Sequence, residues 1–143
     1  MGDQGKLAAL LAKLEEGPDQ CDQRDAGTIL DLAQKLWALN ETNPLPRPQW
    51  ESFLRLTRHP RYLTALADHE RRLAWSTLVF AVIEGIGFNL GDLLQQRTEE
   101  MPDRVLFQDL KESGSGSWTY AQIFQRVRTI AAVFLQEGVA EAP

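Results

Sequence analysis

Residues 105–134 read VLFQDLKESGSGSWTYAQIFQRVRTIAAVF, and this stretch decides the fold class. Two short runs rich in β-branched and aromatic residues, 105–110 and 117–120, enclose a glycine-serine turn, a pattern that predicts a β-hairpin. Thr119 stands three residues before Gln122, which is the spacing of a capping box, because each side chain can bond the other residue's free backbone amide. We therefore expect a hairpin that leads directly into a helix.

That helix has one strongly apolar face, and Gly138 is expected to end it. The face is formed at helical spacing by Ile123, Val127, Ile130, Ala131 and Phe134. A two-stranded ribbon is too small to cover such a face, because isolated hairpins are marginal and a helix stripe needs a sheet or another helix. The chain is therefore expected to stop within a domain, with this face covered by the preceding residues or by another copy of the chain.

The residue composition changes immediately before this stretch, where glycines become frequent. Gly85, Gly87 and Gly91 loosen the backbone, and Asn89 or Asp92 can cap a short helix that ends at Met101-Pro102-Asp103. We place a boundary here, between an all-α N-terminal module of residues 1–86 and an α+β portion of residues 87–143. The expected fold class is thus α+β and mostly helical.

Residues 1–86 show apolar side chains at helical spacing in several blocks. The first block, residues 7–14, is expected to end at Gly17 in a left-handed cap followed by Pro18. Thr28 and Asp31 are expected to start the second helix as a capping box, and that helix should stop near Asn40. The prolines at positions 44, 46 and 48 predict a stiff connector over residues 41–48.

Trp50, Phe53 and Leu54 predict a short one-sided helix before His59-Pro60. A further helix is expected to begin at Arg61 and to be long. Residues 77–83 keep the helical period, yet their β-branched and aromatic content leaves a buried strand open. We favour the helix.

Composition and charge restrict the function classes. The chain has 143 residues, of which 43% are apolar and 24% charged, and its formal charge is −5. An acidic balance argues against a dedicated nucleic-acid binder, which needs excess Lys and Arg. Cys21 is the one cysteine, a usage that fits the cytoplasm, with peripheral attachment to a membrane left open. No signal peptide or membrane-spanning run is expected.

Arginine is concentrated in residues 47–72, which also carry three acidic residues. An anion-facing patch is one interpretation. We favour a solvated helix surface whose arginines pair with the acidic flanking segments. The residues are Arg47, Arg55, Arg58, Arg61, Arg71 and Arg72.

Four pieces in order resemble the opening of the adenylate-forming enzymes, the superfamily of acyl-CoA synthetases, peptide-synthetase adenylation domains and luciferases. The pieces are NLGDLL (89–94), MPDRVL (101–106), WTYAQI (118–123) and FLQEGV (134–139). The resemblance covers about 55 residues, and the branch that it is most similar to is the fatty acyl-CoA synthetases. In that family a short helix leads through a Pro-Asp turn into a hairpin, a Thr-Tyr element and a long helix.

The resemblance implies an ATP-dependent ligase that activates a carboxylic acid, a fatty acid in this branch, as an acyl-adenylate and transfers the acyl group to coenzyme A. ATP, magnesium and coenzyme A would serve the parent enzyme. The family's Ser/Thr/Gly-rich phosphate loop ends in Pro-Lys, whereas residues 113–117 (SGSGS) continue into Trp118 and are interpreted as a turn. No catalytic, cofactor-binding or metal residue can be assigned, so the fragment alone is expected to be inactive.

The residues suggest two further candidate sites. Residues 85–91 (GIGFNLG) resemble a dinucleotide loop with Asp109 as the ribose partner, although the third glycine comes one residue late. Cys21, His59 and His69 could ligate a metal but lack paired spacing. The four tryptophans, at positions 37, 50, 75 and 118, are interpreted as packing residues.

Three functions thus remain open from the sequence: the fragment of an acyl-CoA synthetase-like enzyme, a helical protein-interaction module without catalysis, and a dinucleotide-binding oxidoreductase fragment. The last requires a strand at residues 78–83. The expected partners of the first are the remainder of the parent enzyme and a second copy, without nucleic acid. The acid activated, the acceptor thiol, the role of the extension and the oligomeric state are not specified by these residues.

Overall fold

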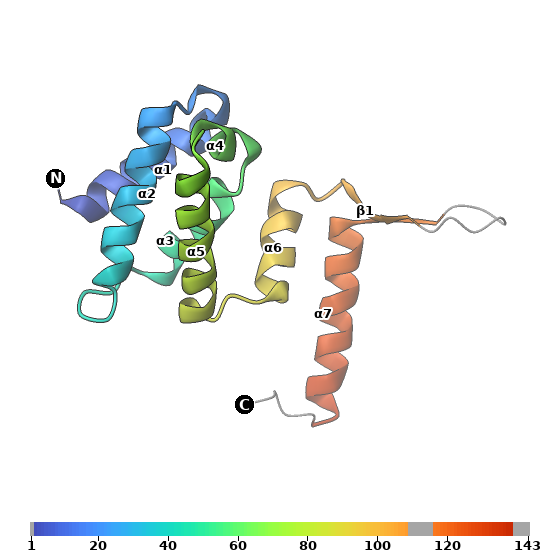
Figure 1. Cartoon of the computed structure of the whole chain (residues 1–143). Helices are drawn as coiled ribbons and strands as arrows, with labels where there is room; N and C mark the ends of the chain where they lie inside the picture. Colours follow the sequence, from blue (N-terminus) through green and yellow to red (C-terminus); the bar gives the residue numbers. More distant parts are fainter. Residues whose placement is uncertain (1, 109–115, 139–143) are drawn as a thin grey trace. The chain divides into compact units, whose positions relative to one another are not determined.

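A computed structural model describes residues 2–108 and 116–138. The chain divides into two units, residues 1–88 and 89–143 (Figure 1). The first unit contains helices only within its described residues. They are α1 (Asp3–Glu16), the 3₁₀ turn η1 (Pro18–Gln20), α2 (Gln23–Ala38), α3 (Arg47–Thr57), α4 (Pro60–Ala65) and α5 (His69–Ile86).

The first unit closes around one apolar core. Helices α1 and α2 pack along each other, and α3, α4 and α5 add the remaining walls. Trp50 and Phe53 of α3 and Tyr62 of α4 are fully buried there, and Trp37 meets the ring of Trp50 edge to face at 5.2 Å between centroids. Since aromatic side chains bury large areas, this cluster dominates the packing of the unit.

The beginning of α2 differs from the sequence expectation. Asp22 is the N-cap, and its carboxylate accepts a hydrogen bond of 2.7 Å from the amide of Asp25. Thr28, the expected cap, lies inside the helix, where its hydroxyl donates to the carbonyl of Arg24. The capping box at Thr28 and Asp31 was therefore wrong, because the buried Ala26 and Gly27 already belong to the helix.

The end of α1 is also corrected. Gly17 has φ −148°, so it is extended and not left-handed. Its amide still bonds the carbonyl of Lys13, and Pro18 begins the short turn η1. The turn direction is thus set by Pro18 rather than by a positive φ.

The proline-rich connector is shorter than expected. Pro48 lies in the first turn of α3, where a residue without an amide hydrogen is tolerated. Asn40 organises the loop before it, since its side-chain oxygen accepts hydrogen bonds from the Leu45 amide and the Trp50 indole, at 3.0 and 3.1 Å. The connector is therefore held by a polar side chain as well as by its prolines.

The helix after His59-Pro60 does not run through to Ile86. It breaks at Ala67, which has a φ of +49°, and α5 starts anew with Asp68 as its N-cap. From His69 to Ile86 the chain is one helix, so the alternative of a strand over residues 77–83 is wrong. Gly87, with φ +66°, ends it in the left-handed cap that favours glycine.

The second unit begins with α6 (Leu90–Glu100), capped reciprocally by Asn89 and Asp92 as the sequence indicated. An antiparallel ribbon follows, β1 (Val105–Gln108) and β2 (Ser117–Thr119), and then α7 (Tyr120–Gln136). Phe107 pairs with Trp118, with an irregularity in the register between Val105 and Phe107. The predicted hairpin and helix are thus confirmed, while the expected strand residues 109–110 and most of the turn lie outside the described residues.

In the described parts of both units, no single helix has the length and apolar composition needed to cross a membrane.

Candidate functional site

The apolar face of α7 is the main candidate for a functional surface in the second unit. None of the helix's side chains is buried. Val127, Ile130 and Phe134 are 44–55% exposed, although Ile123 near the helix start is half-buried. Within the second unit this face is therefore largely uncovered. An amphipathic helix with an uncovered stripe is typical of an interface, because apolar area is stabilised by removal from water.

The start of α7 is firmly anchored. The Thr119 hydroxyl accepts a hydrogen bond from the Gln122 amide at 3.2 Å, and the Gln122 side chain accepts one from the Thr119 amide at 2.9 Å. The next two amides, of Tyr120 and Ala121, donate to the carbonyls of Arg104 and Pro102. All the amides of the first turn named here are satisfied, so the loop before β1 and the capping box together fix the direction of the helix.

An open groove runs beside Trp118 on this unit. Gln122, Gln125 and Ile130 are among its lining residues. The guanidinium of Arg126 lies 4.9 Å from the centre of the Trp118 ring, within the range of a cation–π contact. The sequence pattern indicated a packing role for Trp118 but not this contact, because the contact depends on the direction in which α7 leaves the ribbon.

The arginine-rich segment is not an anion site. Arg55, Arg61 and Arg71 pair with Glu15, Asp19 and Asp31, which all lie in the acidic N-terminal flank. These N···O distances are 3.0, 3.0 and 3.3 Å.

The other arginines of the segment also have partners. Arg47 pairs with Glu51 and donates to the carbonyl of Ile86, and Arg72 donates to the carbonyl of Leu63. Arg58 is engaged as well. The interpretation as a solvated, paired surface is confirmed, and such exposed pairs contribute little stability each.

The glycines of residues 85–91 do not form a dinucleotide loop. A strand would have to precede such a loop, whereas here the preceding residues are helical and Gly85 itself lies within α5. Gly91 lies in the first turn of α6. Gly85 has a packing reason instead, because a Cβ atom at this position would overlap the ring of Trp37. Asp109, the expected ribose partner, lies outside the described residues.

The candidate metal ligands serve different local roles. Cys21 follows η1, the Nδ1 atom of His59 caps α4 by accepting a hydrogen bond from the Arg61 amide, and His69 is the first residue of α5. Across residues 2–108 and 116–138, no group of three or more His, Cys, Asp or Glu side chains could hold a metal ion.

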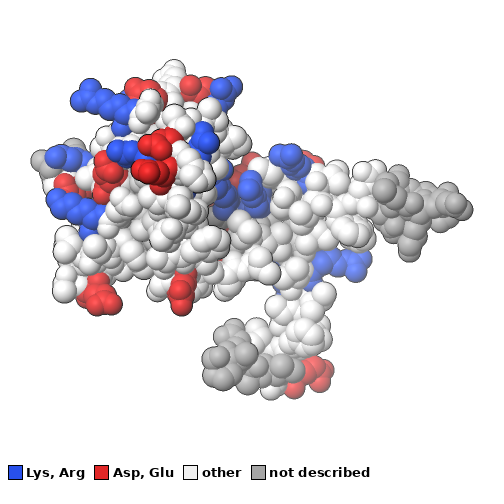
Figure 2. All heavy atoms as spheres, in the orientation of Figure 1, with Lys and Arg blue, Asp and Glu red and all other residues white. Residues whose placement is uncertain are grey.

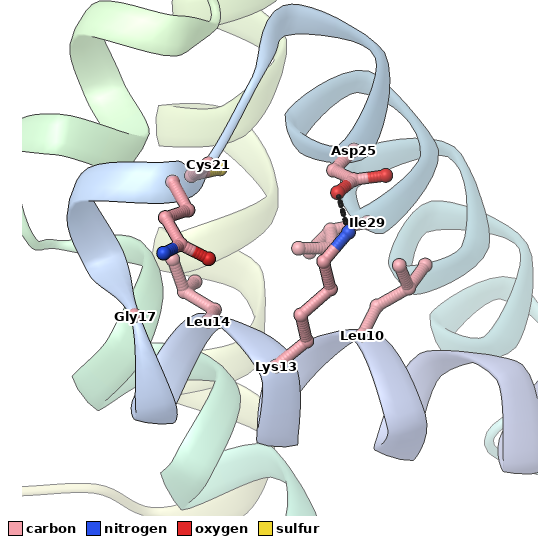
Figure 3. A pocket seen from close by; sticks show the side chains of 8 residues that line it. Leu10, Lys13, Leu14, Gly17, Cys21, Asp25 and Ile29 are labelled. Atoms are coloured by element: carbon pink, nitrogen blue, oxygen red, sulfur yellow. Dashed lines mark hydrogen bonds and ion pairs between the residues drawn. The ribbon is translucent and has the colours of Figure 1, made fainter.

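Cys21 borders a small cavity between α1 and α2 (Figure 3). The cavity holds about 10 Å³, enough for no more than one water molecule. The Lys13 ammonium reaches across it to Asp25 at 2.7 Å, and this ion pair raises the pKa of Lys13. Burial raises the pKa of the Cys21 thiol, so the thiolate that would act as a nucleophile is disfavoured.

A second apolar surface lies on the first unit, and the sequence pattern did not predict it. Leu73 and Phe80 point outward from α5 and are 59% and 71% exposed. The available signal was that residues 73–83 contain no charged side chain, so this helix is apolar on both sides. A helix that is apolar around its whole circumference is usually covered on all sides.

Comparisons with known proteins found no matching family model, no matching curated protein and no matching solved structure.

Proposed function

We propose that this chain is the N-terminal portion of an acyl-CoA synthetase-like enzyme, which activates a carboxylic acid, of the fatty acid class, with ATP and passes it to coenzyme A. The uncovered apolar face of α7 is the observation that carries the proposal. An enzyme of this class would require that helix to pack on a sheet formed by residues that follow the chain.

The order of the elements supports the proposal. A helix capped by Asn89, a Pro102-Asp103 turn, a two-stranded ribbon and a helix capped by Thr119 follow one another. This is the order that the resemblance to adenylate-forming enzymes implies. The apolar side chains of β1 are also exposed, with Phe107 among them. Both elements therefore offer surfaces suited to a larger sheet domain.

The proposal assigns no catalytic step to the described residues. ATP, magnesium and coenzyme A would be held by later segments, because a phosphate-binding loop needs several backbone amides and a lysine converging on one charge. The first unit would serve as an extension before the catalytic domain, in the cytoplasm. The unpaired thiol of Cys21 supports that location.

The coding sequence beyond Pro143 gives the first test. The proposal expects a further parallel strand and a Ser/Thr/Gly-rich loop ending in Pro-Lys downstream. A stop codon directly after Pro143 would overturn it.

An assay gives the second test. The extended polypeptide, supplied with ATP, magnesium, coenzyme A and fatty acids of graded length, should release pyrophosphate and form a thioester. Replacing the lysine of the downstream loop is the matched control and should abolish turnover, while the 143-residue chain should be inactive under the same conditions. An extended polypeptide that folds but forms neither adenylate nor thioester with any of these acids would contradict the proposal.

The competing function is a helical protein-interaction module without catalysis. One observation favours it, namely that the first unit buries its own aromatic core and so forms a self-contained helical body. A stop codon after Pro143 would decide for this alternative.

A further inference from the structure

The outward face of α5 carries exposed side chains whose spacing along the helix is symmetric about a point near its middle. Leu73, Thr77, Phe80 and Glu84 follow at intervals of four, three and four residues, so they share one face. Leu78 and Val82, on the opposite side, are buried in the core of the first unit. The outward face is therefore separate from the packing that holds the unit together.

Packing within the first unit leaves this face largely uncovered. Phe80 is 71% and Leu73 59% exposed, and Thr77 between them is exposed as well. Figure 2 shows an uncharged area where the middle of α5 faces the viewer, with charged groups toward the two ends. Large apolar side chains that share one helix face inside a charged rim are typical of a protein interface.

We propose that two copies of this chain associate through this face, with the two α5 helices antiparallel and Leu73 of one against Phe80 of the other. A two-fold axis between Ser76 and Thr77 forms this contact twice, since in an isologous interface the contact of one residue with a second is repeated with the two copies exchanged. The small side chains at the axis allow the helices to approach closely.

The ends of the helix support a second copy as the occupant. The same axis that pairs Leu73 with Phe80 also places His69 of one copy beside Glu84 of the other. An imidazole and a carboxylate are a hydrogen-bonding pair, and an ion pair when the imidazole is protonated. The antiparallel arrangement also sets the partly positive start of each helix beside the acidic end of its counterpart. A parallel pair would instead oppose Glu84 to Glu84.

The association is expected to be reversible. One helix pair provides an interface at the lower end of the sizes seen in stable complexes. The proposal concerns the first unit alone and does not depend on the proposed enzymatic function, so a failure of either leaves the other standing.

The first experiment measures sedimentation equilibrium of the full 143-residue chain over a range of concentrations. We expect a monomer–dimer equilibrium that F80S weakens by at least about tenfold, because each dimer loses two buried aromatic side chains. Phe80 lies outside the core, so the far-ultraviolet circular dichroism should be unchanged.

The matched control is L90S, which also replaces a large exposed apolar side chain by serine, outside α5 and outside the apolar face of α7. It should leave the dimerisation constant unchanged. A chain that stays monomeric at all concentrations would overturn the proposal, and so would dimers that L90S abolishes and F80S does not.

The second experiment tests the antiparallel order by exchanging charges. H69E places an acidic side chain opposite Glu84 of the other copy and should weaken dimerisation by about fivefold or more. The double variant H69E/E84K restores an opposite-charge pair and should recover most of the affinity. In a parallel pair the double variant would oppose like charges at both ends, so failure to recover would overturn the stated arrangement.

Discussion

At position 85 the packing of a neighbouring side chain, and not helix propensity, determines which residue fits. Glycine is a poor helix former, yet Gly85 lies inside α5, where a Cβ atom would overlap the Trp37 ring. The ring of Trp37 is itself held by the edge of Trp50. The glycine therefore permits the close approach of α2 and α5.

G85A should destabilise the protein by up to about 2 kcal/mol, because overpacking costs about 1–3 kcal/mol and the helix preference of alanine returns only about 1 kcal/mol. Urea denaturation measures the change. In a W37L background the obstructing ring is gone, so the same substitution should become neutral or stabilising. Equal destabilisation in both backgrounds would contradict the packing explanation.

The buried hydroxyl of Tyr62 makes the free energy of unfolding of the first unit depend on pH in the alkaline range. Its hydroxyl donates to the carbonyl of Ala26 at 3.0 Å, and burial raises the pKa of the phenol. Since the folded pKa lies above the unfolded one, the stabilisation is present below about pH 10 and is lost as the pH rises further.

Y62F should therefore cost about 1 kcal/mol at neutral pH, where the hydrogen bond is lost. Above about pH 10 the wild-type chain should lose stability faster than the variant, because its unfolded state gains from ionising the phenol. Denaturation curves at neutral pH and at about pH 11 measure both effects. Parallel pH dependences of the two proteins would refute the role assigned to Tyr62.

At the scale of the element, two residues near the start of α2 are candidate N-caps, and the structure shows which of them caps the helix. Asp22 bonds the Asp25 amide, whereas the Thr28 hydroxyl bonds a carbonyl inside the helix. D22A should destabilise the chain by about 1 kcal/mol, as the loss of an N-cap usually does. The matched variant T28A should change the stability by less than about 0.5 kcal/mol. Urea midpoints compare the two, and the reverse order would contradict the capping assignment.

Elements with a local signal could be predicted from the sequence. The Thr119–Gln122 box and the Asn89 cap are formed by residues three apart, so the short-range pattern determines them. The start of α2 could not be chosen in the same way, because Asp22, Asp25 and Thr28 offer competing caps within two turns. Burial of Ala26 decides among them, and burial depends on distant residues such as Tyr62.

The break at Ala67 and the surface of α5 were missed for a related reason. Apolar residues before and after a break can keep the same helical spacing, so Leu66 and Leu73 gave no sign of the break at Ala67. The signal in the sequence was Asp68, which can cap a new helix. The apolar content of residues 73–83 also left helix and strand undecided. The length of the whole segment, from His69 to Ile86, favours a helix, but which of its faces is outward follows only from the packing of α2 and α3 against it.

The candidate site was less predictable than the fold. The partners of Arg55, Arg61 and Arg71 lie far away in the sequence, so only the general pairing with acidic flanks could be expected. The contact of Arg126 with Trp118 depends on the direction in which α7 leaves the ribbon. Such contacts arise from tertiary structure, which no local pattern encodes.

At the scale of the whole molecule, the apolar core belongs to the first unit. Among the described residues, the buried apolar side chains extend from Leu7 to Val82. Residues 1–88 alone should therefore give a helical circular dichroism spectrum and a single cooperative thermal transition. Residues 89–143 alone should lack a cooperative transition, since a short ribbon and two helices without a buried core are marginal. Loss of cooperativity in residues 1–88 would contradict this division.

The position of this core near the N-terminus has a consequence during biosynthesis. Domains generally fold in the order in which they leave the ribosome, and helical units with mostly local contacts fold within milliseconds. The helical unit can thus be complete while the ribbon strands are still in the exit tunnel. Their unpaired edges, which are templates for aggregation, would emerge attached to an already folded body.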